Sequence, residues 1–307
     1  MQTNQGNYLD SIQLGLGAWA WGDRVVWQYG RGYGPEDIKQ AFELSLARGI
    51  RLIDTAEIYA SGRSERFIGE FAAGTHGQAL VATKFFPWPW RLSRGSVPAA
   101  LKASLIRLRS SRVDLYQIHN PFSPIGIEVL AEGLVDCVAA GLARAVGVSN
   151  FDESQMLRAY STLARNNIHL ASNQVHYSLL QRQVEKNGLL ARCQELGIRL
   201  IAYSPLEMGL LTGKYSRTHL PPGSRALRYP GVISRLQPLL KLMTEIGQDQ
   251  GGKSPAQIAL NWVIAKGALP IPGAKNAAQA QDNAGALGWS LNAQQIAALD
   301  AASDQLT

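Results

Sequence analysis

Eight short apolar segments recur along the chain, and stretches with helical spacing of apolar residues lie between them. The segments span residues 12–17, 50–54, 80–84, 114–119, 145–149, 170–175, 199–204 and 268–273. Most are apolar at consecutive positions, as is typical of parallel strands that are covered on both faces. Eight strands that alternate with helices over 307 residues predict an α/β fold, the (β/α)8 TIM barrel.

Local helix signals support this alternation. In residues 254–267, Ser254 is a suitable N-cap, Pro255 fits the first helical position, and Gly267 ends the pattern. Helical spacing also occurs in residues 35–49, 96–109 and 291–303. Because no linker, low-complexity tract or break in composition divides the sequence, we expect a single domain over residues 1–307.

The net charge of the chain is positive. It carries 30 Lys and Arg residues against 23 Asp and Glu residues, a formal net charge of +7. The positive residues are scattered, as at Arg107, Arg109 and Arg112, and no recognition motif accompanies them. A scattered excess is typical of a solvated surface or of a small anionic ligand. We therefore expect no nucleic-acid partner.

Composition also bears on location. No stretch approaches the roughly 20 apolar residues of a membrane span, and the polar segment 1–10 does not resemble a signal peptide. Cys137 and Cys193 lie in helix-like stretches without metal-ligand spacing. We expect both to be reduced core thiols of a cytoplasmic protein without a membrane association or a bound metal.

Two glycine-rich segments match expressions for nucleotide-binding motifs. GLGAWA (15–20) fits the dinucleotide fingerprint, but a Trp- and Gly-rich stretch follows it instead of a helix. GQDQGGKS (247–254) fits the phosphate-loop expression, but an amphipathic segment precedes it instead of a strand. We interpret the first as a turn at a strand end, and the second as the end of one helix and the start of the next.

Polar or aromatic residues stand at or just past the end of almost every predicted strand. In a barrel of parallel strands these ends meet on one face, where active sites lie. A single residue of this kind is usually a cap or a turn, but a set from seven strands indicates a functional site. The set comprises Asp54, Lys84, His119, Ser149, Asn150, Asn173, Gln174, Tyr203, Ser204, Lys275 and Asn276.

Four residues near these ends suit the reduction of a carbonyl group. A phenol such as Tyr59 has a pKa of about 10, and a neighbouring ammonium such as Lys84 lowers it. Asp54 would hold Lys84 charged, and His119 would donate a hydrogen bond to the carbonyl oxygen. Each residue taken singly also has an ordinary explanation, such as packing for Tyr59 or a surface ion pair for Lys84 and Asp54.

A series of short motifs makes the sequence resemble the aldo-keto reductase superfamily. They occur in family order over nearly the whole chain: DTAEIY (54–59), ATK (82–84), DLYQIH (114–119), GVSNF (147–151), NQVHYS (173–178), AYSPL (202–206), GLLTGK (209–214) and PIPGAKN (270–276). The resemblance implies a monomeric barrel that binds NADP(H) and a small carbonyl substrate. It also implies the catalytic tetrad Asp54, Tyr59, Lys84 and His119, with Glu57 structural or facing solvent.

The resemblance also implies a set of contacts to the coenzyme. Tyr203 would stack on the nicotinamide ring, whose carboxamide would bind Ser149, Asn150 and Gln174, with Ala18, Trp19 and Asp54 beside it. Ser204, Pro205, Leu206 and Lys214 would lie along the pyrophosphate, and Arg225 would close over it. Gly273, Lys275, Gln279, Asp282 and Asn283 would hold the adenosine end. Asp282, where the family more often has Glu, and Asn120, where an aromatic residue is common, depart from the family pattern.

Aromatic residues in the loops after the strands suggest the class of substrate. Trp19, Trp21 and the run of residues 85–90 form an apolar set, and we expect Trp21, Trp88 and Asn120 to line the substrate pocket. Such a wall favours aromatic aldehydes over sugars, whose hydroxyl groups would lose water without gaining partners. The alternative is that these aromatic residues only pack the rim. Because few residues follow the segment 291–303, we expect an open pocket and broad aldehyde reductase activity.

Two other functions are compatible with parts of the sequence. Some members of the superfamily are auxiliary subunits of ion channels that keep the coenzyme site, and a complete tetrad does not exclude that role. A barrel hydrolase would use Asp54 and Glu57 as paired carboxylates, but it leaves Lys84 and Tyr59 without a role. We therefore predict an NADPH-dependent aldo-keto reductase.

Overall fold

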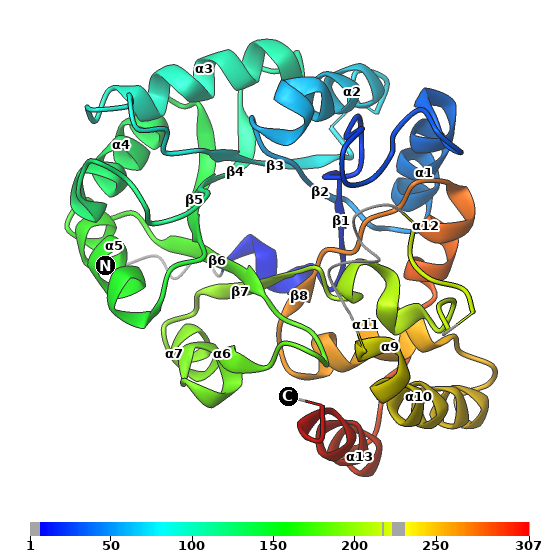
Figure 1. Cartoon of the computed structure of the whole chain (residues 1–307). Coiled ribbons are helices and arrows are strands. Elements are labelled where there is room, and N and C mark those ends of the chain that lie inside the picture. The colour runs from blue at the N-terminus through cyan, green and yellow to red at the C-terminus, as the bar shows by residue number, and fades with distance from the viewer. Residues whose placement is uncertain (1–6, 76, 217, 223–230, 307) are drawn as a thin grey trace.

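The computed structural model describes residues 7–75, 77–216, 218–222 and 231–306. Eight strands ring the centre of the molecule, and helices surround them (Figure 1). The strands are β1 (Gly15–Gly17), β2 (Leu52–Asp54), β3 (Leu80–Phe85), β4 (Val113–Ile118), β5 (Ala143–Ser149), β6 (Leu170–His176), β7 (Arg199–Tyr203) and β8 (Leu269–Pro270).

Neighbouring strands pair in parallel in the order β1 to β8. A parallel bridge between Gly17 and Gly273 joins the first strand to the segment after the last, and the Gly17 amide donates to the Pro272 carbonyl at 2.9 Å. A Cβ atom on Gly17 would lie 2.8 Å from the Ile271 carbonyl oxygen, so only glycine fits at this closure. The predicted (β/α)8 barrel is confirmed.

The helices lie outside the strand ring (Figure 1). The longer ones are α1 (Pro35–Ala47), α2 (Arg63–Ala72), α3 (Ser96–Leu108), α4 (Ile127–Ala139), α5 (Glu153–Ala164), α10 (Gln237–Asp249), α11 (Pro255–Ala265), α12 (Ala277–Ala284) and α13 (Ala293–Asp304). The shorter ones are η1 (Tyr8–Ser11), η2 (Tyr59–Gly62), α6 (Gln183–Lys186), α7 (Leu189–Glu195), η3 (Glu207–Thr212) and α9 (Val232–Arg235).

Apolar side chains fill both sides of the strands. Inside the ring, Leu9 of η1 packs with inward-facing strand residues such as Leu52, Leu115 and Ile201. A larger cluster lies between the strands and the helices, and it includes Cys137 and Cys193. Both cysteines are free and buried, and burial raises the pKa of each thiol to about 12, as suits inert core thiols.

The first and last strands are shorter than the apolar runs that predicted them. Ile12 caps η1 and leaves only Gly15–Gly17 in β1. Strand β8 holds only Leu269 and Pro270, and Pro272 beyond it has no amide hydrogen to donate to a neighbouring strand.

Both segments that match nucleotide-binding motifs adopt the structures that the sequence predicts, a turn in one case and a helix end followed by a helix start in the other. After GLGAWA the chain turns, and α1 does not begin until Pro35. GQDQGGKS covers the end of α10 and the start of α11, where Ser254 is the N-cap.

In the described part of the chain, no helix is both long enough and apolar enough to cross a membrane.

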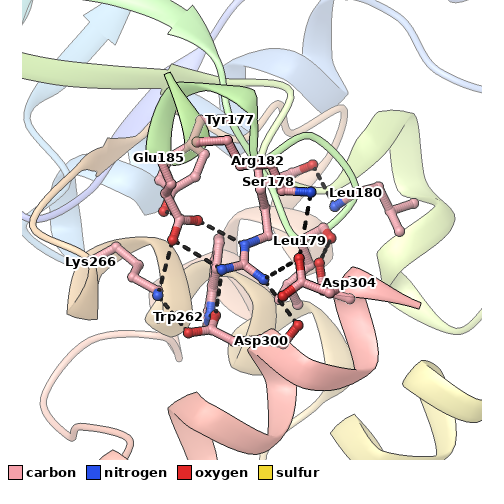
Figure 2. Close-up of polar contacts among 12 residues, drawn as sticks. Tyr177, Ser178, Leu179, Leu180, Arg182, Glu185, Trp262, Lys266, Asp300 and Asp304 are labelled. Carbon is pink, nitrogen blue, oxygen red and sulfur yellow. Dashed lines mark hydrogen bonds and ion pairs between the residues drawn. The ribbon is translucent and has the colours of Figure 1, made fainter. Parts of the chain in front are cut away.

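A network of charged residues fastens α13 to the rest of the barrel (Figure 2). At its centre, the guanidinium of Arg182 donates two hydrogen bonds to the Glu185 carboxylate, at 2.8 and 3.0 Å. The same group lies 3.2 Å from the Asp304 carboxylate and donates to the Asp300 carbonyl at 2.9 Å. Lys266, the C-cap residue of α11, joins Glu185 to Asp300. The last helix is therefore held by ionic as well as apolar contacts.

Candidate active site

A buried ion pair connects the ends of β2 and β3. The Lys84 ammonium lies 2.5 Å from the Asp54 carboxylate and donates to the Thr55 carbonyl at 2.7 Å. Burial lowers the pKa of Lys84, but the charges of Asp54 and Tyr59 and the hydrogen bonds to them together raise it more, so that the pKa lies above its ordinary value. The other Asp54 oxygen accepts from Gln174 at 2.8 Å. Lys84 is therefore a fixed positive charge beneath the face where the strands end.

Tyr59 stands over this charge. Its hydroxyl oxygen lies 3.5 Å from the Lys84 nitrogen, and that nitrogen lies 5.0 Å from the centre of the Tyr59 ring. Ala60, Ser61 and Gly62 follow with positive φ angles, a sharp turn that leads the chain from Tyr59 directly into α2. Burial raises the pKa of Tyr59, and the Lys84 charge acts in the opposite direction.

His119 faces Tyr59 across the barrel mouth. Its ring meets the Tyr59 ring edge to face, with 5.8 Å between the centres, and its amide donates to the Phe85 carbonyl at 2.8 Å. Burial and the Lys84 charge lower the pKa of His119 to about 3, so the imidazole is neutral near pH 7. Its Nδ1 atom is buried and has no hydrogen-bond partner within the described ranges. A neutral ring of this kind can donate a hydrogen bond from Nε2.

Hydrogen bonds link the His119 loop to the end of β7. The Tyr203 hydroxyl donates to Asn150 at 3.0 Å, and the Asn150 amide donates to the His119 carbonyl at 3.0 Å. The Ser149 hydroxyl donates to the Gln174 carbonyl at 2.8 Å. On one side the Tyr203 ring stacks against His176, with 5.2 Å between ring centres. These contacts fix the Tyr203 ring as a flat apolar surface at the mouth.

A cavity of about 480 Å³ runs from Tyr59 and His119 to the N-terminal end of α12. Its size lies within the usual range for small-molecule sites. Most of the residues expected to contact the coenzyme line it. These are Trp19, Asp54, Ser149, Asn150, Gln174, Tyr203, Ser204, Pro205, Leu206, Lys214, Gly273, Lys275, Gln279, Asp282 and Asn283.

At the end of the cavity near α12, the Lys275 ammonium lies beside two aromatic rings. Its ammonium donates to the Trp27 carbonyl at 3.2 Å and lies 4.8 and 4.6 Å from the ring centres of Trp27 and Tyr33. Asp282, the shorter residue at a position where Glu was expected, accepts from Ser254 at 2.7 Å and from Gln257 at 3.0 Å. The Asp282 carboxylate is therefore held by neighbouring helix α11.

Several predicted residues do not line the cavity. Trp21 is fully buried, donates to the Ala274 carbonyl and packs on Phe42, so its assignment to the substrate pocket is corrected. Ala18 is also fully buried, and its amide donates to the Asp54 carbonyl. The buried strand end leaves neither residue a surface toward a ligand.

The remaining predicted site residues are Trp88, Asn120 and Arg225. Trp88 and Asn120 lie in the loops after β3 and β4 but are not among the cavity-lining residues. Trp88 stacks on Trp90, and the Asn120 side chain accepts from the Phe122 amide within its own turn. Arg225 lies outside the described residues.

Sequence reasoning missed a part of the cavity wall formed by the segment between β1 and α1. Ala20, Asp23 and Trp27 line the cavity, as do Met208, Gly209 and Tyr215 after β7. The signal was present in the Trp- and Gly-rich stretch of residues 18–34, which is too long for a simple turn.

Similarity to known proteins identifies the family of the chain. A model of the Aldo/keto reductase family matches residues 13–304. The chain belongs to the aldo/keto reductase family. The prediction that it is an aldo-keto reductase enzyme, and hence an oxidoreductase, is thereby confirmed.

Among curated proteins, this aldo-keto reductase is 43% identical to the chloroplastic pyridoxal reductase of Arabidopsis thaliana over 291 residues, which cover 91% of this chain and 79% of that protein. Among solved structures it is similar to the glycerol dehydrogenase of Gluconobacter oxydans, with a TM-score of 0.84 and 28% identity over 96% of this chain and 92% of that one. It is also similar to an aldo/keto reductase from Klebsiella pneumoniae solved with NADP and acetate, with a TM-score of 0.75 and 28% identity over 94% of this chain and 90% of that one.

Proposed function

We propose that this aldo-keto reductase uses NADPH to reduce aromatic aldehydes to alcohols, with broad specificity and with pyridoxal among its good substrates. The observation that carries the proposal is the buried Lys84–Asp54 ion pair directly beneath Tyr59 at the mouth of the cavity. The similarity to a pyridoxal reductase supports the choice of aldehyde, because pyridoxal is an aromatic aldehyde.

Tyr59 is the proposed general acid. Reduction places negative charge on the carbonyl oxygen, and a phenol held against that oxygen donates its proton as the charge develops. Lys84 stabilises the phenolate that remains, and Asp54 keeps Lys84 charged and in place. Neutral His119 donates a second hydrogen bond to the same oxygen and so orients the carbonyl.

The residues that line the rest of the cavity suit NADPH. The coenzyme, when bound, supplies the hydride that reaches the carbonyl carbon. The Tyr203 ring offers a stacking surface, and Lys214 and Lys275 place two ammonium groups on the wall, which suits a ligand with several phosphate groups. The Klebsiella pneumoniae relative was solved with NADP, which supports the same choice of coenzyme.

The substrate end of the cavity favours an aromatic ring. Trp19 lies beside Tyr59, with 6.4 Å between ring centres, and Ile58 and Ala60 add apolar surface around the proposed acid. A flat aldehyde contacts these groups without leaving hydroxyl groups unpaired, whereas a polyol loses hydration at each buried hydroxyl.

The test is a set of initial rates of NADPH oxidation with pyridoxal, a substituted benzaldehyde and glyceraldehyde, corrected for the free-aldehyde fraction. We expect kcat/KM for the two aromatic aldehydes to exceed that for glyceraldehyde by about tenfold or more, equivalent to about 1.4 kcal/mol. A preference for glyceraldehyde, or faster oxidation of glycerol with NADP⁺, would contradict the substrate class. Tight NADPH binding without turnover of any aldehyde would instead favour a non-catalytic auxiliary role.

A further inference from the structure

Glu57 lies two residues before Tyr59, and the family resemblance implies only a structural or solvent-facing position for it. Its side chain is only 8% exposed. The carboxylate accepts from the Phe86 amide at 2.6 Å and from the Arg91 guanidinium at 2.5 and 2.9 Å. A buried carboxylate with three donors is fixed in position, and so is the backbone that carries it.

Arg91 completes the arrangement from the loop after β3. One of the two Arg91 nitrogens that bind Glu57 also donates to the Phe86 carbonyl at 2.7 Å, so the Glu57–Arg91 pair binds both polar groups of the Phe86 backbone. The guanidinium carbon lies 4.6 Å from the centre of the buried Phe85 ring. Arg91 therefore closes the loop after β3 back onto the end of the strand.

Short connections link the Glu57–Arg91 pair to three of the proposed catalytic residues, Tyr59, Lys84 and His119. Tyr59 follows Glu57 by two residues, and the Glu57 amide lies 3.4 Å from the Lys84 carbonyl to which it donates. The Phe86 ring meets the His119 ring edge to face, with 5.6 Å between centres. Neither Glu57 nor Arg91 lines the cavity, so neither can act on the substrate directly.

We infer that Glu57 and Arg91 form a positioning pair that holds Tyr59 over Lys84 and holds Phe86 against His119, and so sets the geometry of proton transfer. This inference rests on the proposed function of the site. A buried ion pair contributes little net stability compared with apolar packing, but it fixes one arrangement of the groups around it. Proton transfer is sensitive to such placement, because a displacement of about 1 Å can cost roughly 100-fold in rate.

The test uses Glu57→Gln and Arg91→Lys in the full chain. Glutamine keeps the shape of Glu57 but removes its charge, and lysine keeps the charge of Arg91 but loses the two-pronged contact. We expect kcat for a substituted benzaldehyde to fall by about 10- to 100-fold in each variant, within the range set by misplacement. NADPH affinity and aldehyde KM should change by less than about threefold, which is under 1 kcal/mol.

The high-pH limb of the kcat profile provides a second readout. Burial and the Asp54 charge raise the pKa of Tyr59, and Lys84 lowers it, so a Tyr59 phenol that stays buried but moves away from Lys84 loses its proton only at higher pH. We expect the limb to move to higher pH in Glu57→Gln. A change in overall stability alone would lower the amount of active enzyme and would leave this limb where it is.

Glu128 and Arg158 supply a matched control. They form another two-pronged pair, at 2.7 and 2.8 Å, but their side chains are 43% and 51% exposed and join α4 to α5 away from the cavity. Glu128→Gln and Arg158→Lys should leave kcat and its pH profile unchanged.

Crystal structures make the test independent of the choice of substrate. We expect the Glu57→Gln structure to show the Tyr59 hydroxyl displaced from Lys84 or the Phe86 ring displaced from His119. Unchanged positions in that structure, or wild-type kcat in both variants, would overturn the positioning role. If the wild-type enzyme reduces no aldehyde but Glu57→Gln displaces these side chains, the proposed function fails and the positioning role stands. If Glu57→Gln does not fold, Arg91→Lys gives the same readouts.

Discussion

Lys84 and Asp54 form an ion pair at the centre of the barrel mouth, with 2.5 Å between the ammonium nitrogen and the nearer carboxylate oxygen. Because β2 and β3 are parallel neighbours, their ends bring the two residues together. Asp54 is bound by Gln174 on its other side, so neither charge can rotate away. The Tyr59 hydroxyl, 3.5 Å from the ammonium, therefore sits in a field that stabilises its anion.

Tyr59→Phe should abolish most of the reductase activity without affecting the coenzyme site. The substitution removes the acidic hydroxyl and keeps the ring that packs on His119. General acids contribute about 10²–10⁴ to rate, so we expect kcat to fall by that factor while the Kd for NADPH stays within about twofold. Single-turnover rates and NADPH fluorescence titration measure the two quantities. A variant with near wild-type kcat would show that another group is the acid.

Lys275→Ala should weaken NADPH binding more than NADH binding. We expect the Lys275 ammonium to pair with the phosphate that only NADPH carries, and such a contact is worth about 1.5–3 kcal/mol, or about 10- to 150-fold in Kd. Titrations with both coenzymes check the ratio. Lys241→Ala is the control, because the Lys241 side chain is 79% exposed on α10. Equal losses for NADPH and NADH would assign Lys275 a different role.

His119 should stay neutral across the physiological pH range. Its pKa is lowered to about 3 in the folded protein, whereas an unfolded histidine has a pKa of about 6.5. The unfolded chain therefore binds more protons between these pH values, and the contribution of His119 to stability is complete above about pH 6.5 and is lost as the pH falls toward 3. NMR titration of the ring protons, assigned with His119→Gln, should show no inflection between pH 5 and 8. An inflection near 6.5 would contradict this.

Arg182→Ala should destabilise the fold without changing the chemistry. The guanidinium is 9% exposed and binds Glu185, Asp300 and Asp304 (Figure 2). Its removal leaves the half-buried carboxylates of Glu185 and Asp300 with Lys266 as their remaining cation, and lost hydrogen bonds to charged groups typically cost about 1.5–3 kcal/mol of unfolding free energy. Urea denaturation measures this cost, and kcat below the transition should remain near wild type. Arg158→Ala removes one partner of a solvent-exposed ion pair and should leave the urea midpoint almost unchanged.

The order of elements could be predicted from the sequence because its signals are local. Apolar runs without alternation marked buried parallel strands, and Ser254 and Pro255 marked the start of α11 where the structure has it. Once eight strands were recognised, the polar residues at their ends had to meet on one face. The position of Asp54, Lys84 and His119 beside one another follows from that topology.

Other features depended on contacts between residues distant in the chain. Trp21 stands in an aromatic stretch that suggested a pocket, yet the closure of the barrel buries it against Ala274, 253 residues away. Lys275 donates a hydrogen bond to Trp27, which lies 248 residues away in the segment after β1. Both residues line the cavity.

Glu57, in the loop of the proposed acid Tyr59, also has partners that could not be predicted from the sequence. Its motif position is plain in the sequence, but its partners Phe86 and Arg91 are 29 and 34 residues away. The sequence by itself determined the barrel, the polar strand ends and the four residues that we propose as the catalytic tetrad, because periodicity and motif order are properties of neighbouring residues. Only the tertiary structure decided which aromatic side chains face the cavity and which charges pair, because each side chain's orientation is set by packing against elements that are remote in sequence.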